Sequence, residues 1–266
     1  MPALPPPVLV ERHGAVTLLR LNRPDTRNAL SAELTAALHA ELKRAGDDPG
    51  VRCLVLAGTT LADGRRVFSA GADLREMWAM LDAPAEQARL DAGRLADLLR
   101  LIYEGPLPVV AAVEGAAVAG GAGLASACDL VVAGQGARLG YSEVRLGFVA
   151  AVVMVFLLRC VGEKHARELL LTGRLVTAQE AWRIGLLNEV VPDGTTEERA
   201  LELAHEIAGH SRAAVRATRE LLGLLPGLEL GEGLRRAADA NAQARTTEDF
   251  REGVTAFLEK RPPRWP

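Results

Sequence analysis

The sequence predicts an α/β fold followed by a helical region, and three observations predict it. Short apolar runs typical of buried strands alternate with longer amphipathic segments as far as about residue 190. Beyond that point only helical patterns occur. The length of 266 residues suits one large domain or a main domain with a smaller appendage. Because alternating strands and helices can bury both faces of a parallel sheet, this order is typical of the α/β class.

The predicted strands are short and rich in Val, Leu and Ala. Residues 8–21 (VLVERHGAVTLLRL) predict two strands joined by a turn at His13 and Gly14. Further buried strands are predicted at residues 51–58, 107–115 and 129–134.

The predicted helices show apolar positions every three or four residues. Residues 31–46 (SAELTAALHAELKRAG) give the clearest pattern, with Ser31 as the expected N-cap. A long helix is predicted at residues 85–105, and a helix start at residues 120–128.

Helical patterns dominate the chain after residue 160. Residues 190–198 (VVPDGTTEE) form a weak boundary within this part, because they are rich in turn-forming and polar residues. The sequence therefore predicts a core of residues 1–195 and a helical C-terminal region of residues 196–266.

Composition excludes several classes of protein. The formal net charge is −3 and aromatic residues make up 4% of the chain, which gives no electrostatic case for binding nucleic acid or an anionic membrane. The longest apolar run, residues 148–158, is too short to span a bilayer. The first residues (MPALPPPVLVERHG) lack the basic head and long apolar run of a secretion signal.

Cysteine and histidine usage indicates neither disulfides nor a metal site. Cys53, Cys128 and Cys160 are odd in number, widely spaced and set in apolar surroundings, as expected for reduced core residues of a cytoplasmic protein. The five histidines show no pairing at helical spacing that would bind a metal.

The most unusual stretch is EGAAVAGGAGLASACDL, residues 114–130. Its small residues follow a predicted strand and open a predicted helix, where unpaired backbone N–H groups favour negative charge. A dinucleotide site is not supported, because the G-x-G-x-x-G spacing is absent. Close packing of helices through small residues is the alternative explanation.

A second turn of small residues strengthens the case for a site. Residues 66–74 (RVFSAGADL) place Ser-Ala-Gly-Ala-Asp after a loop and before a helical turn, so two such turns could supply converging N–H donors. Glu143 lies between a short predicted strand and a very apolar segment. The combination predicts two backbone donors beside one desolvated acid.

These motifs resemble the enoyl-CoA hydratase/isomerase (crotonase) superfamily over nearly the whole chain. The matching segments, in order, are LNRPDTRNAL, VFSAGADL, AAVEGAAVAGGAGLASACDLVVA, GYSEVRLGF, LLTGRLVTAQEAWRIGLLNEVV and FLEKRP. The resemblance implies a spiral of ββα units with a helical C-terminal trimerisation region, in a homotrimer or a hexamer. It also implies an acyl-CoA thioester substrate whose enolate is stabilised by the backbone N–H groups of Ala72 and Gly120. No metal or redox cofactor is implied, since CoA is part of the substrate.

The sequence departs from the superfamily pattern at one catalytic position. Hydratases with two carboxylates carry one Glu after the glycines and another in the motif that reads YSEV here. Glu143 matches the second, whereas Gly123 stands at the first. A glycine cannot move a proton, so Glu143 is expected to do the acid–base chemistry. Single-Glu members occur among hydratases of branched or glutaconyl-type acyl-CoAs and among enoyl-CoA isomerases.

Four further residues are expected at the CoA end of the site. By resemblance, Lys260 of the FLEKR motif contacts the CoA phosphates of a neighbouring subunit, and Arg27 is a second candidate. Ala70 and Asp73 belong to the same predicted CoA-binding set, and Asp73 is also expected to cap the short helix that follows it.

The sequence therefore predicts a hydratase that adds water across a trans-2-enoyl-CoA. An enoyl-CoA isomerase, in which Glu143 moves a proton between C2 and C4, is the first alternative. An RNA-binding relative is a distant alternative, against which the charge and the few aromatics speak. A scaffold without chemistry is disfavoured, because Glu143 and both donor turns are present.

Overall fold

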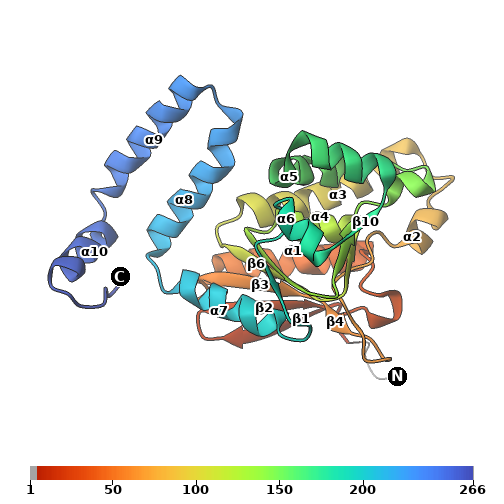
Figure 1. Ribbon diagram of the computed structural model, residues 1–266, viewed down its shortest axis with the longest axis horizontal. Helices are drawn as coiled ribbons and strands as arrows, with labels where there is room; N and C mark the ends of the chain where they lie inside the picture. Colours follow the sequence, from red (N-terminus) through yellow and green to blue (C-terminus); the bar gives the residue numbers. More distant parts are fainter. Residues whose placement is uncertain (1–4, 266) are drawn as a thin grey trace.

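A six-stranded sheet forms the centre of the computed structural model, which describes residues 5–265 (Figure 1). Its strands lie in the order β1 (Val8–His13), β2 (Val16–Leu21), β3 (Cys53–Ala57), β6 (Val109–Val113), β8 (Leu130–Gly134) and β11 (Glu189–Val191). β1 and β2 form the antiparallel hairpin expected around Gly14. All other neighbours are parallel, with Leu54 opposite Val109 in the register of β3 and β6. The predicted α/β class is confirmed.

Two smaller sheets lie beside the main one. The first contains β7 (Ala116–Val118), β9 (Arg138–Gly140) and β10 (Leu175–Thr177), in the order β10-β9-β7. The second pairs β4 (Thr59–Thr60) with β5 (Arg66–Val67). β6 and β7 are consecutive strands in different sheets and are followed by a helix, which is one turn of the expected ββα spiral. The sequence pattern does not predict these short strands.

Helices cover both faces of the six-stranded sheet. One face packs against helices α1 (Ala32–Asp47), α3 (Ala85–Glu104), α4 (Gly120–Ala127) and α5 (Ala151–Thr172). The other face packs against α7 (Thr196–Ala208). Alternate residues of β3 therefore enter different cores: Leu54 faces the first and Val55 the second. Burial on both faces explains why the parallel strands are continuously apolar.

Local signals in the sequence set several helix boundaries. The Ser31 hydroxyl accepts a hydrogen bond from the Leu34 N–H and caps α1, as predicted. Asp73 caps helix α2 (Leu74–Ala79), and Thr177 caps α6 (Ala178–Arg183). Helix α5 is interrupted at Gly162, where φ is +70°. A 3-10 turn, η2 (Glu143–Leu146), precedes α5, and two others, η1 (Pro24–Thr26) and η3 (Leu225–Gly227), occur elsewhere.

The last three helices extend away from the sheet as an arm (Figure 1). They are α8 (Arg212–Leu224), α9 (Leu230–Ala244) and α10 (Glu248–Leu258). Large apolar side chains of this arm are exposed, namely those of Leu222, Leu224, Leu230, Leu234, Phe250, Val254, Phe257 and Leu258. Within residues 5–265, no helix combines the length and the apolarity needed to cross a bilayer.

The division at residues 195 and 196 stays a prediction, but α7 behaves differently from the helices after it. Ala200, Ala204 and Ala208 of α7 are buried against the sheet, whereas α8 and α9 bury none of their residues. The arm that leaves the core thus begins with α8.

Candidate active site

The turn Ser69–Asp73, between β5 and α2, is held by hydrogen bonds to the segment around Asn28. The Ser69 hydroxyl donates to the Asn28 carbonyl at 2.8 Å and accepts from the Gly71 N–H at 3.2 Å. The side-chain amide of Asn28, which is fully buried, donates to the carbonyls of Val67 and Phe68. These bonds fix the backbone on the approach to Ala72.

Asp73 is engaged inside the protein. One carboxylate oxygen lies 2.9 Å from Arg23 Nη1, and the other accepts from the Arg75 N–H at 3.1 Å, which caps α2. Burial alone would raise the pKa of Asp73, but the Arg23 guanidinium and the Arg75 amide hold that pKa below its ordinary value. Both oxygens are therefore used, which agrees with the expected capping role and leaves little capacity for a ligand.

The glycine run opens helix α4, with Gly120 as its first residue. The preceding residue, Ala119, has φ +52° and ψ −122°, and its N–H donates to the Gly140 carbonyl at 2.7 Å. The whole of α4 is buried. Small residues are needed here, because a Cβ on Gly121 would fall 2.6 Å from the Ser69 carbonyl oxygen.

The two predicted donor turns lie against each other. A Cβ placed on Gly120 would be 3.8 Å from the Ala72 nitrogen, and one placed on Gly71 would be 3.3 Å from the Gly120 nitrogen. Across residues 5–265, neither the Ala72 N–H nor the Gly120 N–H donates a hydrogen bond to a protein acceptor. Two neighbouring donors are thus left for a ligand oxygen.

Glu143 begins η2 and is buried, with an exposure of 8%. Its Oε2 atom is buried without a hydrogen-bond partner among the described residues. Burial raises the pKa of the Glu143 carboxyl above its ordinary value. An unpaired buried carboxylate is costly to keep in a structural role, and perturbed acids of this kind cluster at functional sites.

Two contacts connect Glu143 to the donor helix. The buried Tyr141 hydroxyl lies 2.6 Å from the Ser126 hydroxyl of α4. Gly140, at the end of β9, accepts the bond from Ala119. The segment that carries Glu143 is therefore attached to α4 at two points, one of which is adjacent to Gly120.

Gly123 faces helix α5 and not an open space. A Cβ on Gly123 would lie 2.8 Å from Val153 Cβ and closer still to Val153 Cγ1. Val153 is itself 2% exposed, so it has little room to move. At this position the alternative explanation, close packing of helices through small residues, is correct.

The predicted CoA-binding residues occupy two regions. Arg27 and Ala70 are exposed next to the donor turn, where the Ala70 N–H donates to the Arg27 carbonyl at 3.0 Å. Lys260 is exposed and follows α10, and this helix lies at the opposite end of the molecule from α2 (Figure 1). A single chain therefore does not bring Lys260 to the other residues of the predicted site.

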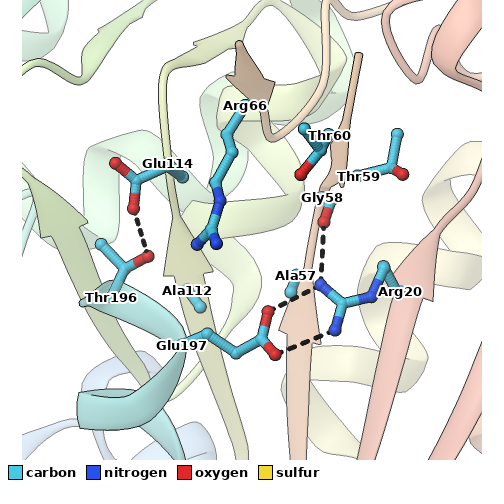
Figure 2. Close-up of a pocket in the computed structure, with 10 residues that line it drawn as sticks. All are labelled: Arg20, Ala57, Gly58, Thr59, Thr60, Arg66, Ala112, Glu114, Thr196 and Glu197. Carbon is cyan, nitrogen blue, oxygen red and sulfur yellow. Dashed lines mark hydrogen bonds and ion pairs between the residues drawn. The ribbon is translucent and has the colours of Figure 1, made fainter. Parts of the chain in front are cut away.

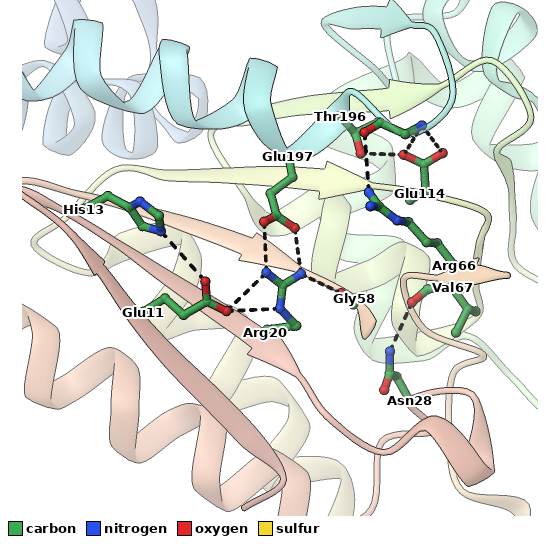
Figure 3. A network of polar contacts seen from close by, with 11 residues as sticks. Glu11, His13, Arg20, Asn28, Gly58, Arg66, Val67, Glu114, Thr196 and Glu197 are labelled. Carbon is green, nitrogen blue, oxygen red and sulfur yellow. Dashed lines mark hydrogen bonds and ion pairs between the residues drawn. The ribbon is translucent and has the colours of Figure 1, made fainter. Parts of the chain in front are cut away.

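A cavity of about 290 Å³ lies elsewhere, at the carboxyl ends of β3 and β6 on the side covered by α7 (Figure 2). None of the predicted site residues lines it. Its main charged groups pair with each other: Arg20 contacts Glu197 at 2.6 Å and Glu11 at 3.2 Å (Figure 3). The side chain of Arg66 also reaches into this cavity.

Glu114 belongs to this second region. Its carboxylate accepts from the Thr196 hydroxyl at 2.7 Å and from the Gly194 N–H at 3.1 Å (Figure 3). It thereby joins the end of β6 to the start of α7. We assign the cavity and its ion pairs a structural role at the junction between the sheet and α7. No unpaired acid lies beside an unpaired hydrogen-bond donor among the residues that line it.

Comparison with known proteins identifies the class to which this fold and site belong. Residues 11–266 match the enoyl-CoA hydratase/isomerase family. A putative enoyl-CoA hydratase from Thermus thermophilus is 50% identical over 97% of this chain and 100% of that protein. The 2,3-dehydroadipyl-CoA hydratase of Escherichia coli is 37% identical over 96% of this chain and 97% of its own length.

Solved structures agree with the sequence matches. The enoyl-CoA hydratase of Mycobacterium smegmatis superimposes with a TM-score of 0.91 at 35% identity, covering 98% of this chain and 99% of that one. An enoyl-CoA hydratase from Bacillus anthracis gives a TM-score of 0.90 at 33% identity, with coverage of 97% and 98%. The chain belongs to the enoyl-CoA hydratase/isomerase family of enzymes and has the crotonase fold.

Proposed function

We propose that this chain is an enoyl-CoA hydratase, which adds water across the double bond of a trans-2-enoyl-CoA. The observation that carries the proposal is the pair of neighbouring, unengaged N–H groups at Ala72 and Gly120, joined through β9 to the buried, unpaired carboxylate of Glu143. Two amide donors suit a thioester oxygen that becomes negatively charged during the reaction.

In this mechanism the Ala72 and Gly120 amides bind the thioester oxygen. Glu143 accepts a proton from water while the water oxygen bonds to C3, and the electrons of the double bond move into the thioester as an enolate. Glu143 then returns this proton to C2 of the enolate, which regenerates the carboxylate. The atoms of one water are added, and no metal or redox cofactor takes part, since CoA belongs to the substrate.

The raised pKa of Glu143 supports its role as both base and acid. Proton transfer is most efficient when the pKa of the catalytic group lies near the working pH. Burial raises the pKa of the Glu143 carboxyl and so moves it toward neutral pH. The apolar side chains that follow it, among them Leu146, Phe148 and Val149, are exposed and suit an acyl chain.

Isomerisation is the second candidate, favoured by one observation. Position 123 is a glycine and carries no second carboxylate, and Val153 fills the space over it. A single acid can move a proton between C2 and C4 without consuming water. Branched or glutaconyl-type acyl groups are the substrates we infer for the hydratase, and the E. coli relative named above is a dehydroadipyl-CoA hydratase.

We further propose that the active protein is a homotrimer or a homohexamer in the cytoplasm. The exposed apolar side chains of α9 and α10 support association through the arm. Association would also allow Lys260 of one subunit to reach CoA bound to another. Arg27 and Ala70 would come from the subunit whose Ala72 amide binds the thioester.

A panel of acyl-CoA thioesters tests the function. Purified protein is incubated with straight, branched and glutaconyl-type 2-enoyl-CoAs and with 3-enoyl-CoAs, and the products are identified by mass. Hydration adds one water, whereas isomerisation leaves the mass unchanged and moves the double bond. Absence of both reactions across the panel would overturn the proposal.

A further inference from the structure

Ala119 has a backbone conformation that glycine adopts far more readily than alanine. Its φ of +52° combined with ψ of −122° lies outside the ordinary left-handed helical region, in which Arg27 is found with φ +55° and ψ +42°. Such conformations are unfavourable for a residue with a Cβ and persist only where the surroundings enforce them.

The surroundings of Ala119 hold both ends of the residue. Its N–H donates to the Gly140 carbonyl at 2.7 Å, and its own carbonyl accepts from the Gly123 N–H at 3.0 Å. The preceding Val118 N–H donates to the Ser69 carbonyl at 3.0 Å. The conformation is thus set by β9, by α4 and by the other donor turn at once.

The methyl group of Ala119 lies beside Gly71. A Cβ on Gly71 would come within 2.7 Å of Ala119 Cβ, which means that the methyl group already fills the space next to the Gly71 backbone. Gly71 immediately precedes Ala72, and Ala119 immediately precedes Gly120. The contact therefore joins the two turns at the residues directly before the two donors.

We propose that Ala119 is a positioning residue for the pair of N–H donors. Its strained backbone directs the Gly120 N–H, and its methyl group, packed on Gly71, sets the separation between the Gly120 and Ala72 amides. Glycine at this position would adopt the same φ and ψ without strain. It would, however, lose the methyl contact with Gly71, and its backbone would be more flexible. The inference rests on the proposed function, in which these two amides bind the thioester oxygen.

The test is the Ala119→Gly variant, measured for thermal stability and for turnover. Relief of the strain should leave Tm unchanged or raise it by about 1–4 °C. Turnover should nevertheless fall about 5–50-fold with little change in KM, because a loosened donor stabilises the transition state less well. Ala119→Ser retains the β-carbon and should keep turnover within about threefold of wild type.

A control variant introduces a Cβ at another position with positive φ, in the turn between β1 and β2. Gly14 has φ +62° in the β1–β2 turn, and a Cβ there would meet no atom within 4 Å. Gly14→Ala should lower Tm and leave turnover unchanged, the reverse of the pattern expected for Ala119→Gly.

The outcomes separate this inference from the proposed function. Wild-type turnover in Ala119→Gly, or a marked fall in its Tm, would overturn the positioning role. An Ala119→Ser variant as slow as Ala119→Gly would also overturn it, since the β-carbon would then not be what matters. If Glu143→Gln, assayed alongside, keeps wild-type turnover, or if the wild-type protein transforms no enoyl-CoA, the proposed function fails and the inference fails with it.

Discussion

The side chain of Val153 lies against Gly123, so that a Cβ on Gly123 would come within 2.8 Å of Val153 Cβ. This contact lies between α4 and α5, both of which belong to the same core. Hydratases with two carboxylates resemble this chain in their other motifs, but this packing leaves no space for a second acid at position 123. In this chain, the absence of an acid at position 123 is therefore coupled to the valine at position 153.

The coupling between these two residues predicts non-additive effects on stability. Gly123→Ala should lower the free energy of unfolding by about 1–3 kcal/mol through overpacking. Val153→Ala should lower it by a similar amount through the cavity that it creates. In the double variant each change relieves the other, so denaturant unfolding should show a loss smaller than the sum. Additive losses would show that the two residues are not in tight contact.

The buried carboxyl of Glu143 predicts a difference in stability between the wild-type protein and Glu143→Gln that depends on pH. Because its folded pKa is raised, the folded state keeps a proton in a range of pH where the unfolded chain has already lost it. The folded state is therefore destabilised as the pH rises from the ordinary Glu value through the folded one. Glu143→Gln does not titrate, so it should be the more stable protein at pH 8, and the difference should vanish near pH 4.

Thermal melts of both proteins over this pH range check the prediction. All other titratable groups are the same in the two proteins, so the difference between the curves reports position 143. A difference that stays constant with pH would contradict the raised pKa.

Local sequence signals predicted much of the fold. The strands β3, β6 and β8, the β1–β2 hairpin and the Ser31 cap were all predicted, because each depends on a contiguous pattern. The three-stranded sheet was missed. Its strands are only three residues long, and β9 pairs with partners that are distant in sequence.

The site was predictable only in part, for the same reason. Motifs indicated Glu143, Ala72 and Gly120, and the structure places the last two side by side. That Val153 packs on Gly123 could not be inferred, because the two residues lie on different helices and no periodicity relates them. The strain at Ala119 could not be predicted either, since glycine and not alanine is the residue that signals such a backbone conformation.

Arg219 is predicted to fix the helical arm to the core. Its guanidinium donates to Asp129 Oδ1 at 2.7 Å and to the carbonyls of Ile102, Tyr103 and Gly105, and its side chain is only 9% exposed. Arg219→Ala would leave these acceptors without their donor, so unfolding free energy should fall by about 3 kcal/mol.

A second arginine on the same helix provides the control. Arg216 pairs with Glu220 at the surface, where its side chain is 63% exposed, so Arg216→Ala should change stability by less than about 0.5 kcal/mol. Equal effects of the two substitutions, measured by urea unfolding, would show that Arg219 is not the anchor.

Lys260 is predicted to contact the 3′-phosphate of CoA bound to a neighbouring subunit. Lys260→Ala should raise KM for acyl-CoA about tenfold more than KM for the 3′-dephospho form, because a charge-assisted contact is lost. An equal rise for both substrates would exclude contact with this phosphate.

Mixed oligomers test whether the contact crosses subunits. Glu143→Gln and Lys260→Ala subunits are dissociated, mixed and reassembled. Some sites then combine an intact Glu143 with an intact Lys260 from the neighbour, so activity with the wild-type KM should return. If Lys260 acted within its own chain, every site with an intact Glu143 would lack it, and KM would stay high.

The central claim is that Glu143 performs the acid–base chemistry beside the Ala72 and Gly120 amides, and its most direct test is the turnover of Glu143→Gln. Glutamine keeps the shape of the side chain but cannot accept the proton. We expect kcat for hydration to fall by roughly 10²–10⁴ while acyl-CoA binding, measured by calorimetry, stays nearly unchanged. A folded Glu143→Gln protein that hydrates its substrate at the wild-type rate would contradict the account.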